Sequence, residues 1–187
     1  MTATFPGGVV LTGRPGSGKT TVVRRTVATL VGHGVRVAGF LTDEVRERGT
    51  RVGFDLVVLT PDGRDADRHP LARVGAVSPV TVGRYGIDVA AVSDALPALS
   101  GPGDVVVVDE VAPMELKAPG FVAAIASAVT GSRPLLATVH ERAGGMATQL
   151  RQDPRLHLLK VTPHTRDTLP DEATLLLLRC LEAARHG

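Results

Sequence analysis

The chain has 187 residues, of which 43% are hydrophobic, 21% charged and 3% aromatic, which predicts one domain, residues 1–187, with a mainly aliphatic core. The formal net charge is +2 and no block of like charges is present, so there is no strong nucleic-acid signal. The single cysteine excludes an internal disulfide, and the lack of a secretory signal or a long apolar run predicts a cytoplasmic protein that does not enter a membrane.

The first predicted element is a short β-branched strand around residues 9–11, and a glycine-rich loop follows it. Residues 13–20 read G-R-P-G-S-G-K-T, which fits the phosphate-binding pattern G-x-x-x-x-G-K-[ST] at each fixed position. Apolar residues then recur at helical spacing from residue 23 to residue 31, so the loop joins a strand to a helix, as the pattern requires. The predicted nucleotide-binding residues are Gly13, Arg14, Pro15, Gly16, Ser17, Gly18, Lys19, Thr20 and Thr21.

The fixed residues of this loop are suited to holding a polyphosphate. Glycines allow backbone angles that turn successive N–H groups inward, and the positive end of the following helix adds to this cradle. Lys19 can place a positive charge on the β- and γ-phosphates, and the Thr20 hydroxyl can bind the Mg²⁺ that bridges them. We therefore expect a polyphosphate site near the start of the chain.

Strands and helices alternate along the rest of the chain. Residues 35–42 are predicted to form a second strand that closes a right-handed βαβ unit. A polar segment, 43–51, and two further strand-like segments, 52–59 and 64–74, predict an antiparallel β insertion over residues 43–74. Helices are then predicted at 87–96, 119–129 and from 169 onward, strands at 104–110, 134–139 and 156–162, and a loop with a helix at 140–151.

A second motif lies at the end of a run of four valines. Residues 104–110 read D-V-V-V-V-D-E, which is typical of a central parallel strand buried on both faces. Because the carboxyl ends of parallel strands meet at one edge of a sheet, Asp109 and Thr20 are predicted to converge on one Mg²⁺ ion. Glu110 is the candidate that orients or deprotonates the attacking water. Neighbouring side chains of a regular strand, however, point to opposite faces, and a polar strand exit or helix cap is the alternative interpretation of this acidic pair.

Charge that develops on the γ-phosphate also requires a cation. Five arginines lie mostly after predicted strands, where the edge of a site is expected, and Arg46 is our first choice among them. They are Arg46, Arg48, Arg84, Arg142 and Arg166. Among the histidines, which show no metal-binding spacing, only His140 directly follows a predicted strand, although a surface position is the simpler interpretation of it.

Six segments, in order, resemble the sequence blocks of a known family. They are GRPGSGKTTVV, GFLTDEVRERGTRVGFDLV, VGRYGIDV, VVVVDEVAPMEL, LLATVH and VTPHTRD. The sequence resembles the small nucleoside-triphosphatase family, also called the cancer-related NTPase family, from residue 9 to about residue 177. The phosphate-binding loop (P-loop) is generic, whereas the blocks at residues 39–55 and 83–86 are more specific to this family.

The resemblance implies a P-loop α/β fold of RecA-like character, with a mostly parallel central sheet flanked by helices and the antiparallel insertion. It implies Mg²⁺-dependent release of phosphate from ATP, GTP and other nucleoside triphosphates. It also implies that Glu44 and Arg46 face the nucleotide. The last block resembles the segment that lies over the base in related P-loop proteins, so Pro163, Arg166 and also Thr165 are candidates for a loose base platform.

The leading hypothesis is a nucleoside-triphosphate phosphohydrolase of broad range that uses Mg²⁺ as cofactor. Its predicted catalytic residues are Lys19, Glu110, Arg46 and Glu44. One alternative is a P-loop kinase that transfers the γ-phosphate to a nucleotide, a nucleic-acid end or a small metabolite. Another is a nucleotide-dependent switch that hydrolyses appreciably only with a partner protein. Nucleoside triphosphates are the expected binding partners in all three.

Overall fold

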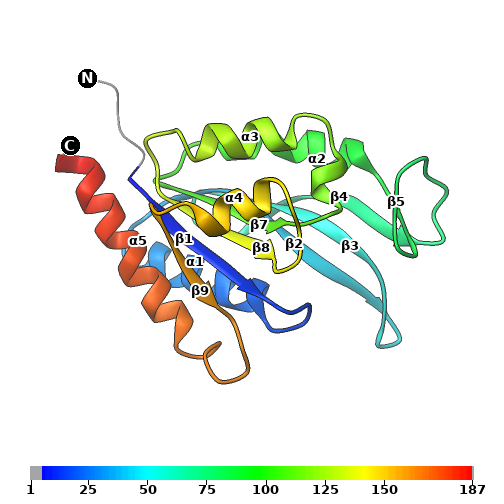
Figure 1. Cartoon of the computed structure of the whole chain (residues 1–187), viewed down its shortest axis with the longest axis horizontal. Helices are drawn as coiled ribbons and strands as arrows, with labels where there is room; N and C mark the ends of the chain where they lie inside the picture. Colours follow the sequence, from blue (N-terminus) through cyan, green and yellow to red (C-terminus); the bar gives the residue numbers. More distant parts are fainter. Residues whose placement is uncertain (1–5, 187) are drawn as a thin grey trace.

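The protein folds around one mixed β-sheet, with helices on both of its faces (Figure 1). A computed structural model describes residues 6–186, so residues 1–5 and 187 of the predicted domain lie outside the described residues. The helices are α1 Lys19–Gly32, α2 Val89–Ala95, α3 Phe121–Ala128, α4 Met146–Gln152 and α5 Leu169–His186, with short 3₁₀ turns η1 Leu96–Ser100 and η2 Glu115–Lys117. The strands are β1 Gly8–Gly13, β2 Val37–Glu47, β3 Thr50–Leu59, β4 Asp65–Val74, β5 Thr81–Val82, β6 Tyr85–Ile87, β7 Val105–Val111, β8 Leu135–His140 and β9 Leu156–Lys160.

The sheet has a parallel half and an antiparallel half that meet at β2. Over residues 6–186 the nine strands are ordered β5-β6-β4-β3-β2-β7-β8-β1-β9. Strands β2, β7, β8, β1 and β9 run parallel, whereas β3, β4, β6 and β5 extend the sheet by antiparallel pairing. The predicted α/β fold with parallel central strands and an antiparallel insertion is therefore confirmed.

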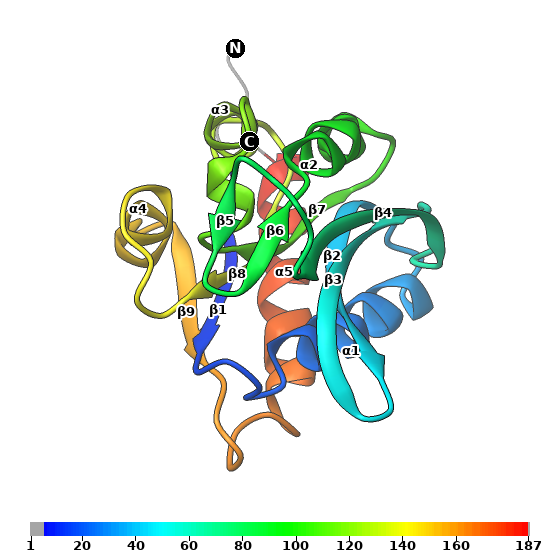
Figure 2. The same ribbon diagram turned by 90° about the vertical axis from the view of Figure 1, so that its right-hand side faces the viewer.

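The core lies in two layers, one on each face of the sheet. Helices α1 and α5 cover one face, and α2, α3 and α4 cover the other (Figures 1 and 2). The valine run of β7 serves both layers, because Val106 and Val108 pack into one cluster while Val105 and Val107 pack into the other. This confirms that β7 is buried on both faces, as its sequence predicted.

The antiparallel half begins earlier and ends later than predicted. Strand β2 does not stop at residue 42 but continues through Glu47, and the antiparallel half extends past residue 74 into β5 and β6. Ion pairs explain why a polar segment is a strand here: Arg51 of β3 binds Glu44 across the hairpin at 2.9 Å, and Arg24 of α1 holds Asp43 at 2.8 Å. Paired charges stabilise neighbouring strands much as apolar pairs do.

Candidate nucleotide site

The phosphate-binding loop has the backbone that its glycines predict. Gly16 and Gly18 have φ angles of 76° and 97°, a region that strongly favours glycine, and Gly18 is the N-cap of α1. The Ser17 N–H donates to the carbonyl oxygen of Arg14 at 3.1 Å, which closes the turn. Helix α1 then begins at Lys19, so its free N–H groups and positive dipole end lie at the loop, as an anion site requires.

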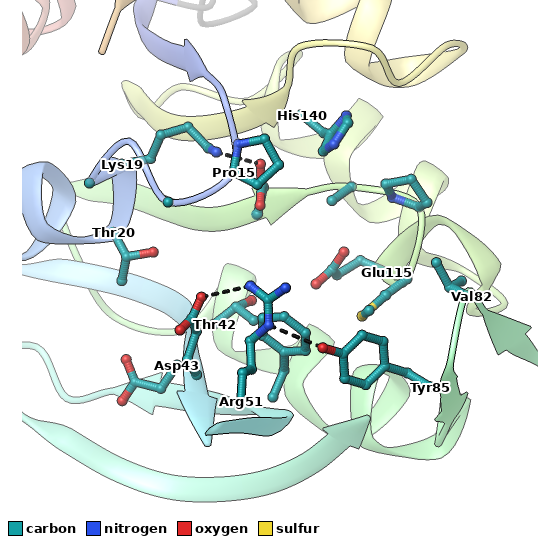
Figure 3. Close-up of a pocket in the computed structure, with 18 of the residues that line it drawn as sticks. Pro15, Lys19, Thr20, Thr42, Asp43, Arg51, Val82, Tyr85, Glu115 and His140 are labelled. Atoms are coloured by element: carbon teal, nitrogen blue, oxygen red, sulfur yellow. Dashed lines mark hydrogen bonds and ion pairs between the residues drawn. The ribbon is translucent and has the colours of Figure 1, made fainter. Parts of the chain in front are cut away.

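Lys19 is held inside the site by two contacts. Its side chain is 7% exposed, and its Nζ lies 3.4 Å from the carbonyl oxygen of Gly13 and 3.2 Å from Oε1 of Glu110 (Figure 3). The ammonium group therefore lies between the loop and the acidic end of β7. A bound phosphate would meet this positive charge at the start of α1.

Asp109 lies at the centre of the site, where it is buried and accepts hydrogen bonds from two threonines. The Thr20 hydroxyl donates to its Oδ2 at 2.6 Å, and the Thr138 hydroxyl donates to its Oδ1 at 2.5 Å. Burial raises the pKa of Asp109 to about 6, and the neighbouring charge of Glu110 adds to this rise. Thr20 and Asp109 are therefore in direct contact, and their binding of one Mg²⁺ ion stays a prediction.

The end of β7 departs from a regular strand at Asp109 and Glu110. The register with β8 shifts between Val108 and Val111, so these two acidic residues together face one residue of β8. The peptide bond that joins them is cis. A bulge of this kind breaks the alternation of side chains, and both acidic residues reach the same site: one binds Thr20 and the other binds Lys19. The opposite-face arrangement of a regular strand does not apply here.

A cavity of about 540 Å³ extends from the phosphate-binding loop to the antiparallel half of the sheet. The loop with Pro15 and the start of α1 with Thr21 form one wall, and the acidic end of β7 forms the next. The far wall comes from β2, β3 and β6, and Figure 3 shows Arg51 and Tyr85 on this side, across the cavity from Lys19. This volume lies within the range of small-molecule sites.

The two residues predicted from the family resemblance, Glu44 and Arg46, both line the cavity. Arg46 binds Glu44 at 2.6 Å and the carbonyl oxygen of Gly49 in the hairpin turn, and its side chain is 55% exposed. Arg51, which the sequence analysis did not single out, shares Glu44 and also donates to the Tyr85 hydroxyl at 3.1 Å. Burial raises the pKa of Glu44, but the two arginines outweigh this and hold it below its usual value.

The residues predicted to contact the base do not line the cavity, whereas His140 does. Arg166, in the turn between β9 and α5, is exposed, but its Cδ lies close to the backbone of Gly18: a Cβ built there would be 3.7 Å away. Pro163 is exposed in the same turn, whereas the Thr165 hydroxyl is engaged within it, donating to the carbonyl oxygen of Lys160. His140 lines the cavity at the end of β8, although a surface position was the simpler expectation.

Comparison with known proteins agrees with this geometry. The sequence model of a family described as NTPase matches residues 8–174. The chain is 42% identical over 183 residues to nucleoside-triphosphatase THEP1 of Methanopyrus kandleri, an alignment that covers 95% of this chain and 99% of that one. It is 35% identical to the human cancer-related nucleoside-triphosphatase, with 95% and 97% covered. The chain belongs to the nucleoside-triphosphatase family.

Solved structures of two family members have the same fold. The crystal structure of THEP1 from Aquifex aeolicus superposes with a TM-score of 0.76 at 28% identity, covering 91% of this chain and 98% of that one. The solution structure of the human nucleoside triphosphatase gives 0.73 at 36% identity, covering 90% and 96%. Membership of the nucleoside-triphosphatase family confirms the predicted fold and the prediction of a hydrolase that acts on nucleoside triphosphates. None of these relatives is named a kinase, so the kinase alternative gains no support.

Four residues of this nucleoside-triphosphatase site were missed or left unassigned by sequence reasoning. Thr42, Arg51, Glu115 and Thr138 contact the acidic centre or line the cavity. Thr138 has a recognisable signal, because it is a lone polar residue inside the apolar strand L-L-A-T-V. Arg51 has none, since its role depends on how the hairpin folds back over β2.

Proposed function

We propose that the chain hydrolyses nucleoside triphosphates to diphosphate and phosphate in this cavity, with Mg²⁺ as cofactor and with water as the acceptor. The observation that carries the proposal is the meeting of two motifs 89 residues apart, joined by the 2.6 Å contact of Thr20 with Asp109. Their pairing supports triphosphate chemistry because the loop alone would bind any phosphate, whereas the acidic pair adds a metal ligand and a group that can hold water.

In the proposed complex the triphosphate lies along the loop, with its γ-phosphate toward Glu110. Backbone N–H groups at the start of α1 and the Lys19 ammonium bind its oxygens. The base extends past the rim toward Pro163 and Arg166, where an exposed guanidinium can stack on any base. An exposed contact of this kind suits ATP, GTP and other nucleoside triphosphates.

Thr20 and Asp109 fit a Mg²⁺ ion. Both present hard oxygen ligands. Burial raises the pKa of Asp109, so a nearby cation would stabilise its ionised carboxylate. Among the described residues, no group of three or more histidine, cysteine or carboxylate side chains is arranged to hold a metal. This suits Mg²⁺, which commonly takes few protein ligands and completes its shell with phosphate and water. When bound, the ion would neutralise charge on the phosphate oxygens.

Glu110 is the proposed group that orients the attacking water. In the structure Lys19 holds its carboxylate, and a phosphate that takes over Lys19 would leave that carboxylate free to accept a proton from water. Arg51 and Arg46 are both candidates to stabilise the transition state, because both line the cavity.

We propose the cytoplasm as the place of action, since one cysteine forms no internal disulfide. Among the described residues no helix has the length and apolar character to cross a bilayer.

Steady-state phosphate release tests the proposal. The purified full chain is assayed with ATP, GTP, CTP, UTP and the deoxynucleotides, with Mg²⁺ and with a chelator. We expect release from all of them in Mg²⁺, with kcat/KM values within about one order of magnitude of each other, and a fall of at least 100-fold with chelator, as metal-assisted phosphoryl transfer requires. Activity confined to one base would contradict the proposed broad range. Activity that the chelator does not lower would contradict the proposed use of Mg²⁺. With γ-labelled ATP, we expect the label only in inorganic phosphate.

A further inference from the structure

A buried carboxyl group at the floor of the cavity has no role in the mechanism described so far. Glu115 begins the 3₁₀ turn η2, six residues after Asp109, and its side chain is only 2% exposed. It nevertheless lines the nucleotide cavity, and Figure 3 shows its carboxyl group directed into the same space as the Arg51 guanidinium. A buried acid in such a place requires an explanation, because glutamate is rarely buried without a partner.

The two oxygens of Glu115 have different surroundings. Backbone groups of Glu115 itself and of Ala112 hydrogen-bond to the carboxyl group, which fixes the side chain in its position. Its Oε2, however, is buried and has no hydrogen-bond partner among the described residues. A buried polar atom left without a partner destabilises the folded state. An orphan atom in a ligand cavity therefore points to a partner that the substrate supplies.

Burial and the neighbouring carboxylates favour the neutral form of Glu115. Burial raises its pKa well above the usual value, and the nearby carboxylates of Glu110 and Asp109 raise it further, against the lowering effect of the backbone hydrogen bonds. A third carboxylate beside a γ-phosphate would repel it, whereas a neutral carboxylic acid can donate a hydrogen bond to it.

We propose that Glu115 is a catalytic residue that donates a hydrogen bond from its Oε2–H to the γ-phosphoryl group as water attacks. In this step a P–O bond forms to the water, the bond from phosphorus to the β–γ bridging oxygen breaks, and the water's proton passes to Glu110. Glu115 keeps its own proton throughout. It contributes a preorganised hydrogen-bond donor, shielded from water and directed at the group being transferred. Such donors usually give the largest single reduction of the activation barrier.

Two substitutions in the full-length chain test this proposal. Glu115→Gln keeps a neutral donor of the same length, and we expect its kcat to stay within about threefold of the wild type. Glu115→Met keeps the volume but removes the donor, and we expect kcat to fall about 100-fold with KM changed less than threefold, as when a single oxyanion donor is lost. Its melting temperature should equal or exceed that of the wild type, because a buried orphan polar atom has been removed. Glu172→Met, on the exposed face of α5, is the matched control and should keep full activity.

Three results would overturn the proposal. Wild-type kcat in Glu115→Met would show that the donor is unused. A parallel loss of kcat and melting temperature in both variants would show a structural role. A Glu115→Gln variant as inactive as Glu115→Met would show that the site needs a carboxylate rather than a neutral donor. The inference rests on the proposed position of the γ-phosphate, which Lys19→Ala tests separately. A fully active Lys19→Ala variant would contradict the proposed nucleotide site as a whole, whereas a fully active Glu115→Met variant would contradict only the role of Glu115.

Discussion

Three hydroxyl groups fix Asp109, the residue on which the rest of the site depends. Thr20 and Thr138 donate to its carboxylate, and Thr42 donates to its carbonyl oxygen at 2.6 Å. These donors come from α1, β8 and β2, so three elements must be in place before this proposed metal ligand is oriented. Neutral donors hold the side chain without neutralising it, which leaves its charge available to a cation.

The raised pKa of Asp109 predicts how the metal-free protein responds to pH. Its value is about 6 in the folded state and close to 3.9 in the unfolded chain, so between these values the folded state binds more protons. Stability should therefore fall as pH rises from 4 to 6, by about 1–3 kcal/mol, and stay at the lower value above pH 6. Urea unfolding in a chelator at several pH values measures this. Asp109→Asn should lack this component, and an identical pH dependence in the two proteins would contradict the assignment.

Substitution of Glu110 should lower turnover without weakening nucleotide binding. Glu110→Gln keeps the shape of the side chain but cannot accept a proton from water, so we expect kcat to fall by 100-fold or more. Nucleotide affinity should change little or improve, because a negative charge beside the γ-phosphate is lost. Fluorescent-nucleotide titration and phosphate release measure the two effects, with Glu172→Gln as the control. A Glu110→Gln variant with wild-type kcat would exclude the proposed role.

At the scale of the elements, the close pairing of β2 with β7 places the β2–β3 hairpin beside Asp109 and Glu110 at the end of β7. Gly39 of β2 makes this possible: its φ is 141°, and a Cβ there would lie 1.9 Å from the carbonyl oxygen of Val107. A β2 strand that moved away from β7 would carry Thr42, Glu44 and the hairpin away from the site.

A pair of glycine substitutions tests this packing. Gly39→Ala should destabilise the fold by more than about 3 kcal/mol, since the clash is with backbone and the φ is unfavourable for alanine. Gly32→Ala, at the end of α1 where a Cβ would meet open space, should be neutral or stabilise by up to about 1 kcal/mol. Urea midpoints measure both. Equal effects in the two variants would show that the approach of β2 to β7 is not critical.

The elements that the sequence predicted well are those whose signal is local. The phosphate-binding loop, the valine strand and the helices have a periodicity or a motif that one segment contains in full. The polar extension of β2 does not, because its strand conformation depends on ion pairs with Arg24 and Arg51 from other elements. The bulge at Asp109 could not be predicted from the sequence of β7 either, because a register shift is a relation between two paired strands. Candidate ligands such as Thr20 were therefore predictable, whereas Arg51 in the cavity wall was not.

At the scale of the whole molecule, the two halves of the sheet supply different parts of the cavity. The parallel half brings the loop and the acidic residues, and the antiparallel half brings Arg51, Tyr85 and Glu44. Arg51 ties these strands together, because it contacts Glu44 of β2 and Tyr85 of β6 and lies 5.2 Å from the centre of the Phe54 ring. The insertion thus lines the proposed nucleotide site.

This arrangement predicts which arginine matters more. Arg51→Ala should lower kcat at least tenfold, because it removes a cation that is anchored on the cavity wall. Arg46→Ala should have the smaller effect, since this side chain is largely exposed and bound at the hairpin turn. Phosphate release by both variants, with melting temperatures to exclude unfolding, decides between them. The reverse ranking would favour Arg46, the residue that the family resemblance implied.

We propose that one site, built on Lys19, accounts for the hydrolysis of nucleoside triphosphates. The chain has only three lysines, and Lys117 is exposed on η2, so Lys117→Ala is a matched control. Mg²⁺-dependent phosphate release should fall at least 100-fold in Lys19→Ala and stay at the wild-type rate in Lys117→Ala. Wild-type phosphate release by a folded Lys19→Ala protein would contradict this account.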